Sequence, residues 1–454
     1  MFKNRFISKR RLSTYSALLL VVWFAQLIVR ITMAIYASRN NTLIGDQSGY
    51  NALGNHFLEY LVHGNCERLP LYPFFLSFIS TLRDIFGFSK RDGVLVVLLI
   101  QHGMMMFSIH LISKLVARFT ARKRLGYFIS LVVFSLYYPT LLSPNGLLTE
   151  SFYIFLLTVP TYLLSMALAV QSPMSLRKTY SVYLTAGFLF GCSALVRPNI
   201  LPFPFLVSLV LLVTKRRAYR QSAAFLVAFC LTMAPWMIRN YVIYGQFAYT
   251  SVSGKNLYSA NKFKEPLTPT GRIFEKRYGR PAQDLRKKKL GGMQNNLKGF
   301  LKRDDVYRNA VFLDAALQHI KWHSNVEFAA FYKEKLDRFL RALFQGATVE
   351  YHYANVSFSI PPTYLHNLYH VLLIVLGLSF FLGKSRNIVP AEGIILMQVL
   401  YSVALFLLAP VCPRMLLPSV FFFLYFAIKR IVALPFIKDI AFADCKDVET
   451  EGKD

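Results

Sequence analysis

Long apolar stretches separated by short polar turns make up most of the chain. Residues 125–149, 151–176 and 354–383 contain no Asp, Glu, Lys or Arg. A helix needs about 20 mainly apolar residues to cross a bilayer, and these stretches are long enough. The pattern predicts an all-α polytopic membrane protein with about ten transmembrane helices. The predicted spans are 13–36, 92–113, 126–144, 149–170, 180–196, 199–214, 222–243, 362–383, 389–409 and 415–433.

The composition of the 454 residues agrees with this pattern and shows that the chain has a large positive net charge. Hydrophobic residues account for 55% and charged residues for 17%, against about 25% charged in soluble domains. This excludes a soluble multidomain enzyme and a disordered chain. Lys and Arg number 52 against 23 Asp and Glu, a net charge of +29. Because no nucleic-acid-binding module fits between the spans, anionic membrane lipids and phosphate-bearing substrates are the expected partners.

Basic residues in the short loops predict the orientation. The N-terminal dozen residues and the loops 114–124, 177–178, 215–220 and 384–386 are basic, which places them and both termini in the cytoplasm. Two long segments then lie on the outer side. Apolar residues at helical spacing predict amphipathic helices within them, over 48–63 and 305–344.

The predicted domains follow from these segments. They are an N-terminal transmembrane module over 1–244 that includes the outer loop 37–91, a basic outer loop over 245–360 that contains the helical segment 305–344, C-terminal transmembrane helices over 361–433, and a cytoplasmic tail over 434–454.

Five charged residues fall at the predicted outer ends of the spans: Asp46, Glu150, Arg197, Arg239 and Arg414. Ionisable groups near apolar spans are costly, so their positions are informative. Arginines supply forked donors for a phosphate, and a carboxylate can accept the proton of an attacking alcohol. The group therefore indicates a site that binds a phosphate and activates a hydroxyl. The alternative is that each charge faces the lipid headgroups at a helix end.

Local motifs then point to a family. GDQSGYNALGNHFLE followed by ERLPLYPFFLSFI resembles the first outer loop of the GT-C glycosyltransferases, in the bacterial family 39 branch related to dolichyl-phosphate-mannose protein mannosyltransferases and the lipid A aminoarabinose transferase. Further pieces follow in the same order: LYYPTLLSPNGLLTESFYIFLL, FGCSALVRPNILPF, APWMIRNYVIYGQF, SVSGKNLYSAN and PRMLLP. Together they span about residues 46–418.

The resemblance implies an inverting, polyprenyl-phosphate-sugar-dependent transferase, a GT-C-like helix bundle with its catalytic part in the N-terminal module, and an active site on the outer side of the bacterial inner membrane. It implies that Asp46 is the general base and that Glu150 helps to position acceptor or sugar. The residues implied for the carrier phosphate are Arg197 and Arg414, with Arg239 as a weaker candidate. Those implied for the substrate pocket are Tyr50, Arg68, Tyr72 and Asn240.

Some features depart from the family pattern. Gln47 follows the first acid, so the paired Asp-Glu of the protein mannosyltransferases is absent, and the WWDYG-like motif of the oligosaccharyltransferases is absent too. A divalent cation beside Asp46 stays open because some GT-C relatives use one. A disulfide between Cys66 and Cys412, both on the predicted outer side, is also open.

The competing functions are a transporter or flippase of a lipid-linked sugar and a non-catalytic membrane scaffold. A secondary transporter usually contains an inverted repeat, and this sequence contains no internal repeat. The long outer loops also favour the transferase. The acceptor is a hydroxyl of a glycolipid, a cell-surface glycan or a protein, and the sequence does not choose between them.

Overall fold

The structure is a computed structural model. It describes residues 2–40, 43, 45–64, 66–169, 175–214, 219–245, 247–261, 363–382, 389–408 and 413–434, with single positions between 309 and 343. Throughout these residues the regular elements are helices, as the apolar pattern predicts. Most of the predicted basic loop 245–360, including most of the segment 305–344, and nearly all of the tail 434–454 lie outside the described residues.

Each apolar segment predicted from the sequence coincides with a helix. The helices are α1 (Phe2–Asn40), α5 (Lys90–Phe119), α6 (Lys123–Leu136), α8 (Glu150–Ala169), α9 (Leu176–Ala194), α10 (Phe203–Thr214), α11 (Tyr219–Tyr244), α17 (Thr363–Leu382), α18 (Gly393–Leu408) and α19 (Pro413–Val432). By length and apolarity, four of the described helices (α1, α5, α8 and α11) can cross a bilayer, or five if the bent helix after α5 is one span. The chain is thus an all-α membrane protein, and the count of ten spans stays a prediction.

The third predicted span, 126–144, is not one straight helix. It consists of α6, the short α7 (Tyr138–Leu142) and a 3-10 turn (Ser143–Asn145), with a bend of 68° after Leu136. Pro139 explains the bend, because proline has no N–H to donate and its ring clashes with the carbonyl four residues before it. The bend turns the chain toward the start of α8.

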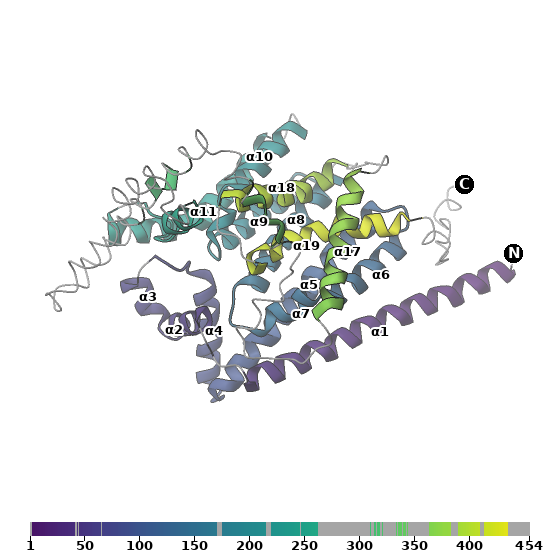
Figure 1. The fold of residues 1–454 in the computed structure, drawn as a ribbon, viewed down its shortest axis with the longest axis horizontal. Helices are drawn as coiled ribbons and strands as arrows, with labels where there is room; N and C mark the ends of the chain where they lie inside the picture. Colours follow the sequence, from purple (N-terminus) through teal and green to yellow (C-terminus); the bar gives the residue numbers. More distant parts are fainter. Residues whose placement is uncertain are drawn as a thin grey trace.

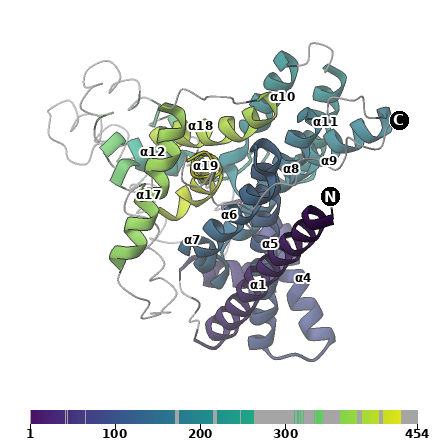
Figure 2. The same cartoon turned by 90° about the vertical axis from the view of Figure 1, so that its right-hand side faces the viewer.

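Helix α5 contacts α1, α4 (Leu71–Ile85), α6 and α8. Figure 2 shows α1 running alongside α5 and α6. The next layer is formed by α9, which packs against both α8 and α11. Figure 1 shows α2 (Asp46–Asn55), α3 (Phe57–His63) and α4 gathered where α1 ends, far from its N-terminus.

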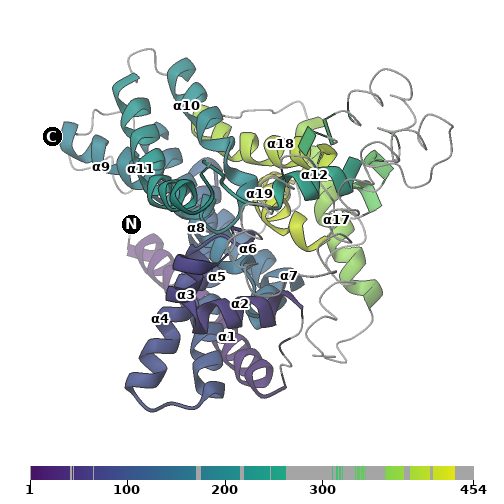
Figure 3. The same cartoon turned by 90° about the vertical axis from the view of Figure 1, so that its left-hand side faces the viewer.

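Those three helices follow α1, and they correct a prediction. The segment 48–63 is not one amphipathic helix, because α2 (Asp46–Asn55) and α3 (Phe57–His63) are separated at His56, whose φ of −120° and ψ of 39° are not helical. Gly54 and Asn55 are weak helix formers just before the break. A third helix, α4 (Leu71–Ile85), packs against α2 (Figure 3).

Glycine permits the close approach of α2 to α4. A Cβ atom at Gly54 would lie 2.6 Å from the Cβ atom of Leu76, which is too near for any other residue. The backbones of α2 and α4 therefore lie close together. Polar residues of α2 line two cavities, one on each side of this helix.

The C-terminal helices are joined by a buried polar group. In the 3-10 turn Pro390–Glu392, the carboxylate of Glu392 accepts hydrogen bonds from Lys429 Nζ at 2.5 Å and from the hydroxyl of Tyr425, both on α19. The carboxylate is fully buried and the ammonium group nearly so. Breaking such a pair leaves an uncompensated buried charge, so it fixes how α19 sits against this turn.

Candidate active site

The first predicted acid starts α2 and forms an ion pair. Gly45 precedes it with φ of 57°, a left-handed conformation that favours glycine and sets the start of the helix. Arg68, in the connection between α3 and α4, donates from Nη2 to Asp46 Oδ1 at 2.6 Å. Both side chains are about one-third exposed, 36% for Asp46 and 34% for Arg68. The pair is therefore accessible and can exchange partners.

Tyr50 lies one turn after Asp46 and completes this half of the site. The Arg68 guanidinium lies 4.9 Å from the centre of the Tyr50 ring. Burial lowers the pKa of Arg68, but Tyr50 and Asp46 raise it by more, so the net shift is upward. Arg68 is a permanent cation in this site.

Tyr72 packs against the ring of Tyr50. Its ring meets that of Tyr50 edge-on at 5.1 Å, and its buried hydroxyl donates to Gln101 Oε1 at 2.8 Å. Gln101 in turn donates to the carbonyls of Pro144 and Gly146, at 3.0 and 2.8 Å. Tyr72 thus links α4 and α5 to the turn before α8.

The second predicted acid starts α8 and is paired in the same way. Arg197 follows α9 and donates from Nη2 to Glu150 Oε1 at 2.6 Å and from Nε to Thr149 Oγ1 at 2.8 Å. Its guanidinium lies 5.6 Å from the centre of the Tyr153 ring. This pair is much less accessible than the first, with exposed fractions of 1% for Glu150 and 13% for Arg197.

Both ion pairs face one cavity of about 140 Å³. Predicted site residues that line it are Asp46, Tyr50, Arg68, Glu150 and Arg197. They come from three places far apart in the sequence: α2 with the connection to α4, the start of α8, and the turn after α9. Residues that the sequence reasoning missed also line it, namely Glu67, Thr149, Asn199 and Asn256. Thr149 accepts a hydrogen bond from Arg197. The sequence offered one signal for it, because Thr149 directly precedes Glu150, the acid at which α8 starts.

Three predicted site residues do not line the cavity, namely Tyr72, Arg239 and Asn240. Arg239 of α11 donates to the carbonyls of Leu61, Tyr60 and Gly64, at 2.8, 3.0 and 2.7 Å, and to Asn240 Oδ1 at 2.8 Å. These carbonyls end α3, where helical carbonyls have no partner within the helix. Neither Arg239 nor Asn240 lines the cavity.

Arg239 and Asn240 therefore clamp α3 to α11, and the carrier and substrate contacts predicted for them stay predictions. Asn240 is fully buried, and its amide donates to the carbonyl of Ala248 at 2.6 Å. The Arg239 guanidinium also lies over Trp236, 4.8 Å from the ring centre.

Loss of this clamp is expected to expose Cys66. The thiol is buried in the cluster around Tyr60, Trp236 and Tyr244, and burial raises its pKa. Arg239→Ala removes the bonds to α3, so we expect alkylation of Cys66 by maleimide to accelerate at least about tenfold. Peptide mass spectrometry measures this rate at Cys66 alone.

Arg220→Ala, at the other end of α11, is the matched control. It removes an exposed cation from the same helix and should leave the rate at Cys66 unchanged. Equal rates in wild type and Arg239→Ala would contradict the clamp.

Three other predictions concern residues that are described in part. Arg414 is in the first turn of α19, and its side chain lies outside the described residues, as does all of Cys412. Among the described residues, no three His, Cys, Asp or Glu side chains gather as metal ligands.

No protein family matches the sequence, and no curated protein does. Solved structures are similar. The oligosaccharyltransferase of Archaeoglobus fulgidus in its apo form is 12% identical with a TM-score of 0.47, over 89% of this chain and 50% of that one. The chain thus spans half the length of that enzyme.

A second similar protein is ArnT from Cupriavidus metallidurans. Bound to undecaprenyl phosphate it is 14% identical with a TM-score of 0.39, and in the apo state 13% identical with a TM-score of 0.37. Each comparison covers 92% of this chain and 76% of ArnT. With TM-scores below 0.5, no activity and no residue role follows from these likenesses. Both enzymes belong to the GT-C class that the sequence motifs resemble.

Proposed function

We propose that the protein is an inverting glycosyltransferase that moves a sugar from a polyprenyl-phosphate carrier to a hydroxyl acceptor on the outer face of a bacterial inner membrane. One observation carries the proposal. Two carboxylate–arginine pairs, Asp46–Arg68 and Glu150–Arg197, face one cavity at the ends of apolar helices. A transferase of this kind needs cations for a phosphate, a base for a hydroxyl, and a place for both beside the lipid.

The accessible pair supplies the chemistry. The phosphate of the carrier draws Arg68 away from Asp46, because forked hydrogen bonds from arginine suit phosphate oxygens. The freed Asp46 carboxylate accepts the proton of the acceptor hydroxyl while its oxygen attacks the anomeric carbon. The bond from that carbon to the phosphate oxygen breaks, and its electron pair leaves on the phosphate. One displacement inverts the anomeric centre.

The buried pair holds the geometry. The hydrogen bond between Glu150 and Arg197 joins the start of α8 to the turn after α9. Arg197 also lines the cavity, where its guanidinium adds positive charge beside the departing phosphate. Charge that develops on a leaving group is stabilised best by donors already in position. Arg414 belongs to the same proposal through the motif resemblance alone.

Release of the carrier in detergent tests this proposal. Purified protein in detergent micelles is supplied with a panel of polyprenyl-phosphate sugars and candidate acceptors, and free polyprenyl phosphate is measured by mass spectrometry. A transferase releases carrier and yields a glycosylated acceptor, whereas a flippase without two compartments releases nothing. Carrier binding without release across the panel would contradict the transferase and favour the flippase.

A further inference from the structure

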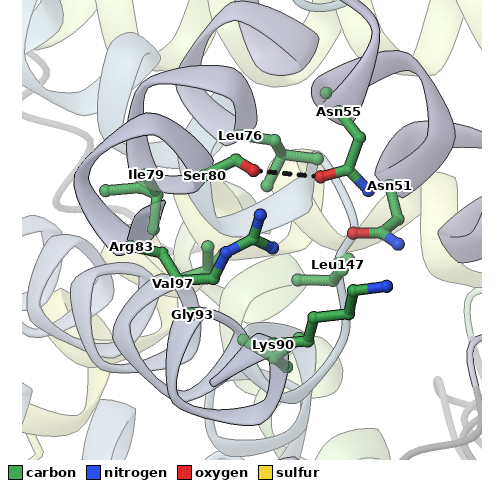
Figure 4. A pocket seen from close by; sticks show the side chains of 12 residues that line it. Asn51, Asn55, Leu76, Ile79, Ser80, Arg83, Lys90, Gly93, Val97 and Leu147 are labelled. Carbon is green, nitrogen blue, oxygen red and sulfur yellow. Dashed lines mark hydrogen bonds between the residues drawn. The ribbon is translucent and has the colours of Figure 1, made fainter. Parts of the chain in front are cut away.

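A second, smaller cavity lies on the other side of α2, and the proposed transfer reaction does not use it. Its volume is about 30 Å³, and its lining comes from α2, α4, α5 and Leu147. Figure 4 shows its polar side chains, Asn51, Asn55, Ser80, Arg83 and Lys90, around one opening. Two cations and three neutral polar groups therefore meet there.

The cations Arg83 and Lys90 both line the cavity. The stem of Arg83 lies along α5, where a Cβ atom at Gly93 would be 3.0 Å from Arg83 Cδ. The guanidinium uses Nε and Nη2 to bind Asp84 Oδ1, at 2.9 and 2.7 Å, and Asp84 does not line the cavity. Lys90 makes no ion pair with any described residue. Figure 4 shows the Arg83 and Lys90 side chains in the same opening.

The neutral groups add donors. Ser80 donates to Asn55 Oδ1 at 3.0 Å, which leaves the N–H groups of that amide for another partner. The Asn51 amide makes no hydrogen bond with a described residue. Amide donors beside the remaining N–H groups of an arginine and an ammonium group suit the oxygens of a phosphate.

The position of the cavity indicates where that phosphate comes from. Lys90 and Gly93 belong to the first turn of α5, which is long and apolar enough to span a membrane, so the cavity lies at the end of a span. Helix α4 and its connection to α5, which contribute to the lining, also carry exposed apolar side chains: Phe74, Phe78, Ile85, Phe86 and Phe88. Apolar side chains of this kind insert at the boundary between lipid headgroups and acyl chains.

We propose that this cavity binds the phosphate of an anionic membrane lipid, with Arg83 and Lys90 as its cations and the apolar side chains of the α4–α5 hairpin against the acyl chain. The lipid joins α2, α4 and α5 and steadies the helix that carries Asp46 and Tyr50 on its other face. This binding is independent of the sugar-transfer reaction.

Quenching by brominated lipids tests the proposal. The full chain with Phe86→Trp is reconstituted in phosphatidylcholine bilayers that contain either brominated phosphatidic acid or brominated phosphatidylcholine. The parent chain without this tryptophan supplies the background from the three native tryptophans. Each cation near a membrane surface favours an anionic lipid by about fivefold. We expect brominated phosphatidic acid to reach half-quenching at a mole fraction at least about fivefold lower.

Matched substitutions distinguish a site from diffuse surface charge. Lys90→Gln should reduce the preference by at least about fivefold, while Arg91→Gln, which removes the next charge on α5 outside the lining, should reduce it clearly less. Arg83→Lys should reduce it with the fold and the charge retained. Equal quenching by the two lipids, or equal losses in Lys90→Gln and Arg91→Gln, would overturn the proposal.

Competition with inorganic phosphate distinguishes a bound lipid phosphate from bound free phosphate. At equal ionic strength, 10 mM phosphate (about the level that fills a weak anion site) should leave the preference for phosphatidic acid intact, because the bound lipid also uses its acyl chain. If phosphate erases the preference and chloride does not, the site takes free phosphate and the lipid assignment is wrong.

Discussion

Asp46→Asn is expected to reduce sugar transfer by about 100- to 10,000-fold, the usual contribution of a general base. The amide has nearly the same shape as the carboxylate and keeps an oxygen for the hydrogen bond from Arg68. Asp46 is also one-third exposed, so the variant should fold and bind the carrier. The loss should therefore appear in kcat and not in carrier affinity. Single-turnover transfer and carrier binding, measured on the same preparation, separate the two.

Glu67→Gln is the matched control for this substitution. Glu67 is an exposed carboxylate that lines the same cavity, so its substitution changes the cavity charge by the same amount. We expect a reduction of less than about tenfold. If Glu67→Gln and Asp46→Asn were equally impaired, cavity charge and not a base at position 46 would explain the loss. Turnover by Asp46→Asn near the wild-type rate would remove Asp46 from the mechanism.

Arg197→Met is expected to destabilise the protein strongly. It leaves the carboxylate of Glu150, which is 1% exposed, without its cation, and removal of one partner of a buried pair costs about 3–5 kcal/mol. Glu150→Gln in the same background should recover most of that loss, because it removes the unpaired charge and keeps the shape. Thermal unfolding in detergent of the two single variants and the double variant measures the coupling between the residues.

Glu59→Gln is the control for the buried pair. Glu59 pairs with His56 at 3.9 Å on the surface, with side chains 74% and 73% exposed. Exposed pairs contribute little to stability, so the melting temperature should not change. Additive losses in the Glu150 and Arg197 variants would contradict the coupling that the 2.6 Å contact implies.

The helices were predictable because their signal is local. A run of apolar residues long enough to span a bilayer specifies a helix whatever its neighbours are, and each such run coincides with a helix. The interruptions at Tyr137 and His56 depend on weaker local signals. Pro139 was visible in the sequence but can also be tolerated at the start of a helix, and the Gly54–Asn55 pair marks a break only because α4 packs closely there.

The members of the candidate site were easier to predict than their pairing. Charges placed at helix ends on one face named Asp46, Glu150 and Arg197, the family resemblance added Arg68, and all four line one cavity. The same rule named Arg239, whose guanidinium instead binds the carbonyls at the end of α3. Sequence shows where an arginine lies along a helix, and the packing of distant helices decides which acceptors surround it.

The most direct measurement is an experimental structure of the protein with undecaprenyl phosphate bound. We expect the phosphate in the cavity between α2 and α8, within hydrogen-bond distance of Arg68 and Arg197, with Asp46 released from Arg68. A phosphate bound outside this cavity, or bound in it with the Asp46–Arg68 pair unchanged, would contradict the proposed mechanism.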